Sequence, residues 1–544
     1  MKTHEVFNQA PSFENINLYN TDALLMELVE KNNAAWAVGQ LKSYGEKLGS
    51  REWIEKGFLA NRHTPVFHPN DRFGNRTDFI EFHSSYHEYM ALAIENGLTS
   101  MPWSEKRNGA HLARLGMDYM HIQNESGTCC PITMTFSCVP AIKNHFPKAD
   151  EWLPKILNRK YDPANKPYTQ KQGVTIGMAM TEKQGGTDVR ANTTQAKPAG
   201  KAAPGEAYLL TGHKWFCSAP MCDAFLTLAQ TANGLSCFLM PRWLPDGSKN
   251  SWFVQQLKDK LGNRSNASGE IEMEQATGWL IGDKGRGVAT ILEMVAMTRY
   301  DCMIGSSGLM RRGVAEAVHH CAHRKVMGEL LINQPLMQNV LADLCIEAEA
   351  ALAMACRAAV CLDNEKDETE QLLLRLLLPV GKYWITKRAT PLMAEAMECL
   401  GGNGYVEQSI LPRLFREAPV NAIWEGSGNV QCLDAVRAIG KSLQSLDVYI
   451  AELDSAAGKN KIYDAYLAAL KKNIRQLGAA QTQARRFIEC LAVAVQAAQL
   501  LKLENNPVAD AFCQSRLNEH PGLLFGNLPD GIEYKKIIQR FSVN

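Results

Sequence analysis

The spacing of apolar residues predicts helices at both ends of the chain and strands in the middle. Asp22 precedes an apolar run that begins at Ala23, and a capping residue before such a run is typical of a helix start. From about residue 75 to 160, apolar residues recur every three or four positions. We therefore predict a helical N-terminal domain over residues 1–171.

The period changes near Val174, where shorter runs of apolar residues begin. The strand-like runs occupy residues 174–180, 207–218, 225–230 and 235–240, with glycine and proline between them. The run at 207–218 resembles a hairpin that turns at Thr211 and Gly212. Together these runs predict a compact β domain over residues 172–284.

Helical spacing returns after Gly287 and continues almost to the end. Long helical patterns occupy residues 288–325, 335–362, 367–400 and 429–443. Four long helices with short links predict a bundle, which we assign to residues 285–444. Two more patterns, at 461–477 and 480–504, predict a helical C-terminal domain over residues 445–544.

Composition narrows the class of protein without assigning a function. The 544 residues carry a net charge of +1, so any surface that attracts nucleic acid must be local. The 15 cysteines show no C-x-x-C pair, which in a chain of this length indicates free thiols in a reducing compartment. We find neither a signal-peptide pattern nor an apolar run long enough for a membrane span, and expect a cytoplasmic protein.

The first candidate for chemistry is Glu425, which stands between an aromatic residue and a small-residue turn. Gly426, Ser427 and Gly428 allow close approach of backbone to a ligand, and a helix is predicted from Gln431 onward. A carboxylate at such a turn can be held against a reacting carbon. An ordinary turn with a surface glutamate is the alternative.

Two segments at strand ends could contact a planar polar ligand. Residues 180–188 supply hydroxyl groups and a Gly-Gly pair, although a surface turn has the same composition. Farther on, Phe216 and Ser218 should share one face of a strand, since alternate residues point the same way. The alternative is that Phe216 is a core residue and Ser218 caps a turn.

Two further features lie at helix ends in the predicted bundle. Arg324 could pair with a phosphate group or be an ordinary surface charge. The glycines of residues 400–405 fit a tight turn after a helix.

Taken together, these segments resemble the acyl-CoA dehydrogenase family over residues 105–440. The resemblance implies a mostly α fold with a central β domain: a helical N-terminal domain, a β-barrel and a four-helix bundle, here followed by a C-terminal helical extension. It also implies bound FAD, held partly across a subunit interface, and Glu425 as the base that removes the α-proton of an acyl thioester. The implied cofactor-binding residues are Met180, Thr181, Gly186, Thr187, Phe216, Ser218, Arg324, Gln338, Gly401, Gly402, Ile423, Trp424, Gly426, Ser427 and Asn429.

Within that family, the longer layout is similar to the AidB branch. The features that carry this likeness are residues 180–188, the segment 258–268 and the motif around Glu425, together with the N- and C-terminal additions. Departures from the usual family motifs include Met327, Glu398 and Trp424. The AidB resemblance implies a role in the adaptive response to DNA alkylation, a homotetramer, weak acyl-CoA dehydrogenase activity, and binding of double-stranded DNA by the C-terminal region.

A basic run in the C-terminal region is compatible with that DNA-binding role. Lys471 and Arg475 are one helical turn apart and share a face, so such residues could follow phosphates without reading bases. A solvated helix face is the alternative. The candidate DNA-binding residues are Arg437, Lys441, Lys471, Lys472, Arg475, Arg485 and Arg486.

Three functional hypotheses follow from this sequence. The first is an FAD protein that binds DNA and protects it from alkylation, either by deactivating alkylating agents or by shielding sites. The second is an active acyl-CoA dehydrogenase that uses Glu425, and the third is a DNA-binding regulator with structural FAD. Two histidine pairs, His83 with His87 and His319 with His323, have metal-ligand spacing but no convincing third ligand, so we predict no metal.

Overall fold

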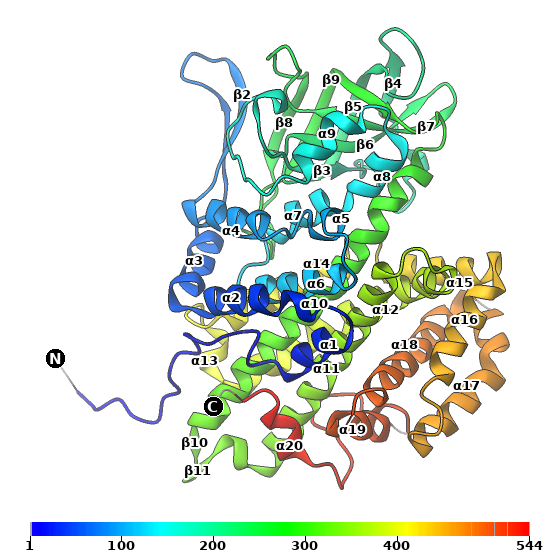
Figure 1. The fold of residues 1–544 in the computed structure, drawn as a ribbon. Helices are drawn as coiled ribbons and strands as arrows, with labels where there is room; N and C mark the ends of the chain where they lie inside the picture. Colours follow the sequence, from blue (N-terminus) through cyan, green and yellow to red (C-terminus); the bar gives the residue numbers. More distant parts are fainter. Residues whose placement is uncertain (1–2, 480, 505, 519–520, 543–544) are drawn as a thin grey trace. The chain divides into compact units, whose positions relative to one another are not determined.

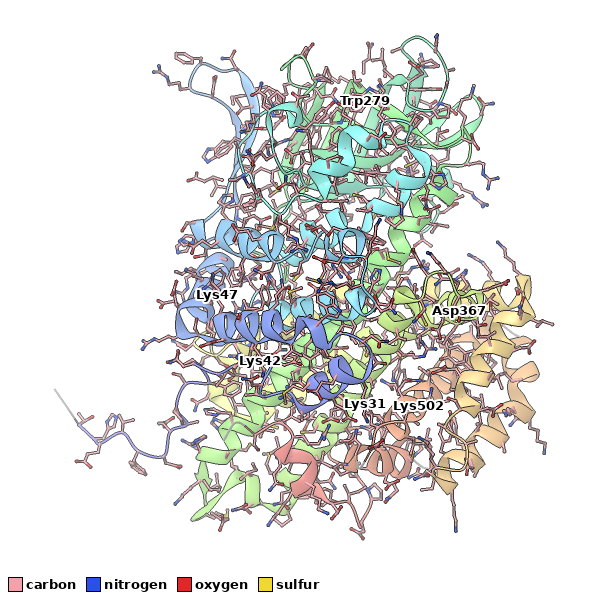
Figure 2. All side chains as sticks on the ribbon, in the orientation of Figure 1. Lys31, Lys42, Lys47, Trp279, Asp367 and Lys502 are labelled. Atoms are coloured by element: carbon pink, nitrogen blue, oxygen red, sulfur yellow. The ribbon has the colours of Figure 1, made fainter. Side chains whose placement is uncertain are left out.

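Four long helices form in the second half of the chain, where the apolar pattern predicts them. In this computed structural model they are α10 (Gly287–His323), α11 (Pro335–Asp363), α12 (Glu368–Cys399) and α15 (Gly428–Lys441). The carboxylate of Asp367 accepts hydrogen bonds from the N–H groups of Thr369 and Glu370 and so caps α12 (Figure 2). The prediction of a mostly helical chain with a central β domain is confirmed (Figure 1).

The structure describes residues 3–479, 481–504, 506–518 and 521–542, with the backbone alone for residues 475–479. These residues form two compact units. The first unit comprises Met1–Ile54, Arg107–Asn124 and Cys302–Asn544, and the second comprises Glu55–Lys106 and Glu125–Asp301. All 15 cysteines are free thiols, as the composition predicts. Among the described residues, no helix has the length and apolar character needed to cross a membrane.

In the first unit, α12 is the central packing element. It contacts α11, α14 (Leu411–Asn421), α15 and α16 (Leu443–Asp454), and its apolar side chains are buried along most of its length. Three helices from earlier in the chain complete this core: α1 (Ala23–Lys31), α2 (Val38–Gly49) and the buried α6 (Ala110–Ile122). Asp22 caps α1 by accepting from the N–H of Leu25, as predicted.

Three of the C-terminal helices pack onto the bundle of the first unit through α11: α18 (Ala484–Leu501), α19 (Pro507–Arg516) and α20 (Tyr534–Gln539). The fourth, α17 (Lys461–Ala479), packs against α18 and α19. The helix α18 contacts α11, α12, α15 and α16, and most of its residues are buried. The sequence predicts α17 and α18, whereas the shorter α16, α19 and α20 lack a long enough apolar pattern.

The strands of the second unit close into a barrel. They are β3 (Ile176–Ala179), β4 (Gln195–Pro198), β5 (Ala207–Ser218), β6 (Ala224–Thr231), β7 (Gly234–Pro241), β8 (Trp252–Leu257) and β9 (Ser268–Ile281). The order β6-β4-β5-β9-β7 returns to β6 through the β6–β7 pairing, so the sheet has no free edge along this path. Strands β3 and β8 pair with β6 and β9 respectively.

Helices accompany the barrel within the second unit. They are the later part of α3 (Arg51–Arg62), then α4 (Ser84–Glu95), α5 (Met101–Ser104), α7 (Cys129–Ser137), α8 (Val139–His145) and α9 (Ala149–Ile156). The rings of Trp152 and Tyr168 stack at 4.1 Å, and Trp279 of β9 (labelled in Figure 2) lies 6.1 Å from Trp152. This aromatic cluster packs α9 against the barrel.

The prediction that the helical block begins near residue 75 is wrong. Residues 66–81 form a hairpin of β1 (Val66–Asn70) and β2 (Arg76–Glu81). The carboxylate of Asp71 accepts from the N–H groups of Phe73 and Asn75, and Gly74 has a φ of 87°. This Asx-type turn favours a hairpin over a helix at this point.

The predicted turn at Thr211 and Gly212 is also wrong. Strand β5 runs unbroken from Ala207 to Ser218, and its register with β9 shifts between Leu210 and Gly212. A Cβ atom at residue 212 would lie 2.5 Å from the hydroxyl oxygen of Thr194, so the glycine permits close contact between neighbouring strands. In this strand the glycine marks a bulge and not a turn.

Candidate functional site

The loop after β3 carries the first predicted flavin-contacting segment, within the second unit. Met180 and Thr181 are half-buried, whereas Gly186 and Thr187 are exposed. A Cβ atom at residue 186 would lie 2.4 Å from the hydroxyl oxygen of Thr181, so the loop requires glycine there. The N–H of Trp215 donates to the backbone oxygen of Thr181 at 2.8 Å, which joins this loop to β5.

A second bulge in β5 decides which of its side chains are accessible. The register with β9 shifts between Lys214 and Cys217, and both of these side chains are buried. Phe216 and Ser218 flank Cys217 on the opposite face of the strand, and Phe216 is 56% exposed. Nδ2 of Asn266 donates to the hydroxyl of Ser218 at 2.8 Å. An exposed ring and a fixed hydroxyl on one face can stack on and bond to a planar polar ligand.

A buried ion pair fastens the first loop to β5, and sequence analysis does not single it out. Nζ of Lys214 lies 2.9 Å from Oε1 of Glu182, and neither side chain is exposed. Thr193 and Thr194 donate further hydrogen bonds to the same carboxylate. Burial by itself would raise the pKa of Glu182, but Lys214 and Thr194 hold it well below its usual range. The one signal in the sequence is a lysine in the middle of a strand pattern, between the apolar runs 208–210 and 215–217.

The segment 258–268, which contributes to the AidB resemblance, lies beside these aromatic residues. Nζ of Lys258 is 3.3 Å from the centroid of the Trp215 ring and 4.9 Å from that of Phe216. The same ammonium group pairs with Glu270 at 2.6 Å. This cation–π contact fixes the edge of the face that carries Phe216.

In the first unit, an open depression of about 390 Å³ gathers several predicted cofactor-binding residues. Its lining includes Arg324, Gly401 and Gly402, and also His320 and Glu398. A Cβ atom at residue 401 or 402 would meet nothing within 4 Å, so the backbone there faces open space. A guanidinium group and open glycine backbone suit an anionic ligand, whereas the carboxylate of Glu398 would repel such a ligand.

Arg324 also holds the N-terminal segment of the chain. Its Nη1 donates to the backbone oxygen of Asn8 at 2.6 Å, and Oδ1 of Asn8 accepts from the N–H of Lys325. Gln338 lies half-buried in the first turn of α11, next to Met337, which lines the depression. The short α13 (Gly402–Tyr405) follows the two glycines.

Glu425 lies in the turn between α14 and α15, in a conformation that few side chains adopt. Its φ is 58°, in the left-handed region, and Gly426 follows with a φ of 96°. The side chain of Glu425 is half-buried, and the preceding Ile423 is 66% exposed. Nε1 of Trp424 donates to the side chain of Asn421 at 3.1 Å, which fixes the indole ring at this turn.

Two predicted cofactor-binding residues follow this turn at the start of α15. Ser427 and Asn429 are exposed, and Ser427 occupies the N-cap position of the helix. Oδ1 of Asn429 accepts a hydrogen bond from Nε of Arg485 in α18 at 2.9 Å. A residue predicted to contact the cofactor and a residue predicted to contact DNA are therefore directly bonded.

Most of the predicted DNA-binding side chains are exposed on α15, α17 and α18 of the first unit. The exposed ones are Arg437, Lys441, Lys471, Lys472, Arg485 and Arg486. Lys471 forms an ion pair with Asp454, which offsets its charge. Arg475 lies in α17, and its side chain is outside the described part of the structure.

The predicted histidine pairs make ordinary protein contacts. Nδ1 of His83 accepts from the N–H of Ser85, and His87 bonds to the hydroxyl of Tyr161 at 2.9 Å. His319 bonds to a backbone oxygen at 2.8 Å, and so does His323. In the part of the chain that the structure describes, no group of three or more histidine, cysteine or acidic residues could hold a metal.

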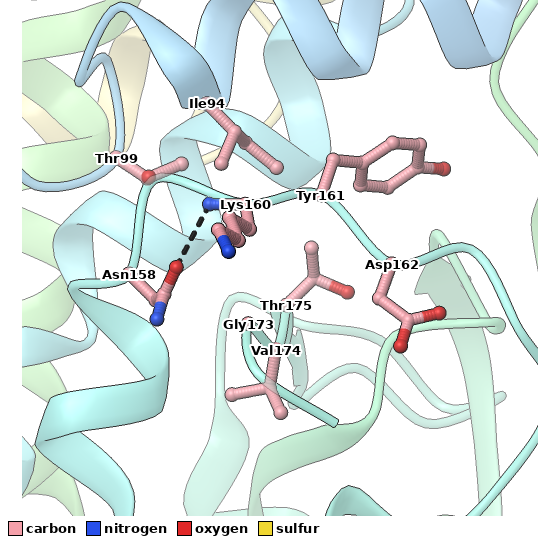
Figure 3. Close-up of a pocket in the computed structure, with 9 residues that line it drawn as sticks. All are labelled: Ile94, Thr99, Asn158, Lys160, Tyr161, Asp162, Gly173, Val174 and Thr175. Carbon is pink, nitrogen blue, oxygen red and sulfur yellow. Dashed lines mark hydrogen bonds between the residues drawn. The ribbon is translucent and has the colours of Figure 1, made fainter. Parts of the chain in front are cut away.

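A small cavity in the second unit is too small for a substrate. Residues from three segments line it, including Thr99, Tyr161 and Thr175 (Figure 3). Its volume is about 10 Å³, which leaves room for one water molecule at most.

The barrel and the long helices give this chain the fold of the acyl-CoA dehydrogenases. A solved structure of the Caenorhabditis elegans protein ACDH-11, in complex with C11-CoA, matches with a TM-score of 0.85 at 24% identity, over 99% of this chain and 93% of that one. An acyl-CoA dehydrogenase from Bacillus anthracis, complexed with FAD, matches with a TM-score of 0.69 at 15% identity, over 94% and 90% of the two chains. The predicted fold class is confirmed.

Sequence comparison identifies the branch within that class. The family model for the N-terminal domain of the adaptive response protein AidB matches residues 8–163. Models for the middle and C-terminal domains of acyl-CoA dehydrogenases match residues 177–276 and 285–440. The AidB protein of Escherichia coli strain K12 is 43% identical over 524 residues, which is 96% of each chain. The chain therefore belongs to the AidB family of acyl-CoA dehydrogenase-like proteins.

Proposed function

We propose that this chain is an FAD protein of the adaptive response that binds double-stranded DNA through its C-terminal helices and protects it from alkylation. The observation that carries the proposal is the direct bond between Arg485 and Asn429, because it joins the exposed basic surface to the motif that carries Glu425. Membership of the AidB family over nearly the whole chain supports the same assignment.

The predicted cofactor-binding residues suit FAD. Phe216 presents an exposed ring, and Thr181 and Ser218 supply hydroxyl groups within the second unit. In the first unit, Arg324 and the open backbone at Gly401 suit the phosphate groups of a dinucleotide. FAD, when bound, supplies a hydride acceptor. A pure protein that is colourless and cannot be reconstituted with FAD would refute this part of the proposal.

The exposed cations suit the backbone of duplex DNA better than a specific sequence. Arg437 and Lys441 are four residues apart on α15 and share a face, and Lys472, Arg485 and Arg486 add charge on the neighbouring helices. Phosphate contacts of this kind confer affinity without base recognition. A homotetramer, which the family resemblance implies, would multiply a modest affinity by bringing four such surfaces together.

The subunit interface that the tetramer needs has a candidate surface in the first unit. The hairpin of β10 (Lys325–Val326) and β11 (Glu329–Leu330) exposes Met327 at 99%, and Leu336 nearby is 83% exposed. Apolar side chains with this exposure commonly mark contacts with another chain. Mass photometry should give four times the mass of one chain, and a monomer at micromolar concentration would contradict the tetramer.

The protective role can be tested by methylating DNA in the presence of the protein. A labelled duplex is treated with a methylating agent, with the FAD-loaded protein, with the protein freed of FAD, or with neither. Protection by both forms indicates shielding of sites, whereas protection by the FAD form alone indicates deactivation of the agent. Equal adduct levels with and without saturating protein would contradict both versions.

A second candidate function is acyl-CoA dehydrogenation with Glu425 as the base. The left-handed conformation at Glu425 favours it, because strained backbone is retained most often where a side chain must be aimed. Under anaerobic conditions, acyl-CoA thioesters of increasing length should bleach the flavin, and Glu425→Gln should abolish the bleaching. Flavin that stays oxidised with every thioester would exclude this function.

A further inference from the structure

A buried lysine contacts the backbone of the turn that carries Glu425. Lys382 lies in the middle of α12, and its side chain is fully buried. Its Nζ donates to the carbonyl oxygen of Trp424 at 2.8 Å and to that of Gly426 at 2.6 Å. Burial removes the hydration of an ammonium group, and these charge-assisted hydrogen bonds replace part of it.

A second side chain contacts the same turn and shares the carbonyl group of Gly426 with Lys382. Nε2 of Gln431 donates to the backbone oxygens of Glu425 and Gly426, at 2.9 and 3.0 Å. Gln431 lies in the first turns of α15 and is also fully buried. Two buried side chains therefore bind three consecutive carbonyl oxygens, those of residues 424, 425 and 426.

The conformation of the turn explains why it needs these contacts. Consecutive left-handed residues at Glu425 and Gly426 turn neighbouring carbonyl groups toward the same side. This arrangement is unfavourable for glutamate, because its Cβ atom crowds the backbone in the left-handed region. The hydrogen-bond donors on the inner side of the turn compensate for this unfavourable conformation. They hold the backbone of Glu425 in one conformation, which fixes the direction in which its side chain extends.

We propose that Lys382 is a positioning residue for Glu425: its bonds to residues 424 and 426 hold the turn in the one conformation that aims the carboxylate at its substrate. The proposal rests on the second function above, in which Glu425 is a base. In that step, the C2–H bond of an acyl thioester breaks, the proton passes to the carboxylate, and the electron pair remains as an enolate.

Packing alone does not account for a lysine at this position. The neighbouring residues of α12, such as Val380 and Ile385, are apolar and buried, so methionine would fill the same space without a charge. Beyond what methionine would supply, the ammonium group donates the hydrogen bonds to the carbonyl groups of Trp424 and Gly426. Replacing it should therefore affect the turn far more than it affects the bundle.

Hydrogen exchange of the full-length protein tests the positioning role directly, and it needs neither FAD nor substrate. In Lys382→Met, amide exchange in residues 423–431 should be roughly 10-fold faster or more, because the variant loses two charge-assisted hydrogen bonds. The other helices of the bundle should exchange as in the wild type. The matched control is Lys366→Met, which removes an exposed lysine just before the same helix and should change nothing. Unchanged exchange in residues 423–431, or faster exchange spread evenly through the bundle, would overturn the proposal.

A second readout separates this proposal from the function on which it rests. Acetoacetyl-CoA has an acidic C2 proton, and its enolate absorbs in the near ultraviolet. With the FAD-loaded protein, enolate absorbance should fall in Lys382→Met and in Glu425→Gln, and should persist in Lys366→Met. One outcome would separate the two claims: faster exchange of the turn in Lys382→Met, together with equal enolate absorbance in the wild type and Glu425→Gln. It would show that Lys382 holds the turn and would refute Glu425 as the base.

Gln431→Met provides an independent test if Lys382→Met does not fold. This variant removes the other donor to the turn, and its exchange in residues 423–431 should also rise, by a smaller factor because the lost bonds are uncharged. Exchange at the wild-type rate in Gln431→Met would contradict the need for donors on the inner side of the turn.

Discussion

Lys214 and Glu182 meet inside the second unit with their charged atoms 2.9 Å apart and with no exposure of either side chain. The pair lies between the loop of residues 180–187 and the strand that presents Phe216. Burial lowers the pKa of Lys214, although Glu182 opposes that shift. The pair thus links two predicted flavin-contacting segments that are distant in sequence.

Removing one member of this pair should destabilise the protein strongly. A buried charge left without its partner costs about 3–5 kcal/mol, so Lys214→Met and Glu182→Gln should each lower the free energy of unfolding by that order. The double variant should lose less stability than the two single variants lose together, because neither charge is then left without its partner. Urea unfolding measures all three, and strictly additive losses would contradict a coupled pair.

Phe216 should contribute to FAD affinity. Its ring is exposed and not part of the barrel core. Phe216→Ala should therefore weaken FAD binding about 3- to 10-fold, the range expected for one aromatic stacking contact. Titration of the FAD-free protein, followed by flavin fluorescence, gives the dissociation constant. Phe73→Ala is the control, because Phe73 is 72% exposed at the tip of the β1–β2 hairpin and should leave FAD affinity unchanged. A wild-type constant in Phe216→Ala would remove this residue from the proposed site.

Glu452 should make the attachment of the C-terminal helices sensitive to acid. Its carboxylate accepts from Arg357 at 2.9 Å, from Gln499 at 2.7 Å and from Lys502 (labelled in Figure 2) at 2.6 Å, which links α11, α16 and the end of α18. Burial by itself would raise the pKa of Glu452, but Arg357 and Lys502 lower it to about 2.

Because the folded-state pKa is depressed, the ionised carboxylate stabilises the protein fully above about pH 5, and this contribution is lost as the pH falls toward 2. Glu452→Gln should therefore reduce the free energy of unfolding by about 2–3 kcal/mol at pH 7 and flatten its decline between pH 5 and 2. The control is Glu533→Gln at an exposed pair with Lys536. Wild-type stability of Glu452→Gln at pH 7 would contradict this account.

The long helices and most strands could be predicted because each depends on local patterns. Asp22 and Asp367 cap helices whose apolar spacing extends over several turns. Apolar periodicity does not predict the hairpin before α4, because the turn at Asp71 depends on hydrogen bonds from the backbone to its side chain. Nor does the sequence distinguish the bulge at Gly212 from a turn, because glycine is favoured in both.

The candidate site could be predicted in its segments but not in its supporting contacts. Glu425 and Phe216 stand in recognisable motifs, whereas Lys382 is one of two lysines in α12 and lies 43 positions before the glutamate it would position. Glu182 and Lys214 are likewise 32 positions apart. Nothing local marks such residues, because their role depends on which backbone groups the fold brings to them.

Salt dependence of duplex-DNA binding, measured by fluorescence anisotropy, tests the central claim most directly. Charge-removing variants are preferable to truncation, because α18 is buried against the bundle and its loss would expose the core. The test variant replaces Lys472, Arg485 and Arg486 by alanine, and the control replaces three exposed cations on α2 and α3, which are Lys42 and Lys47 (both labelled in Figure 2) and Arg51. We expect the slope of log affinity against log salt to become shallower by about 3 in the test variant, since each phosphate contact contributes about 0.9, and to stay at the wild-type value in the control. Equal slopes in all three proteins, or no binding by the wild type, would contradict a DNA-binding function of these helices.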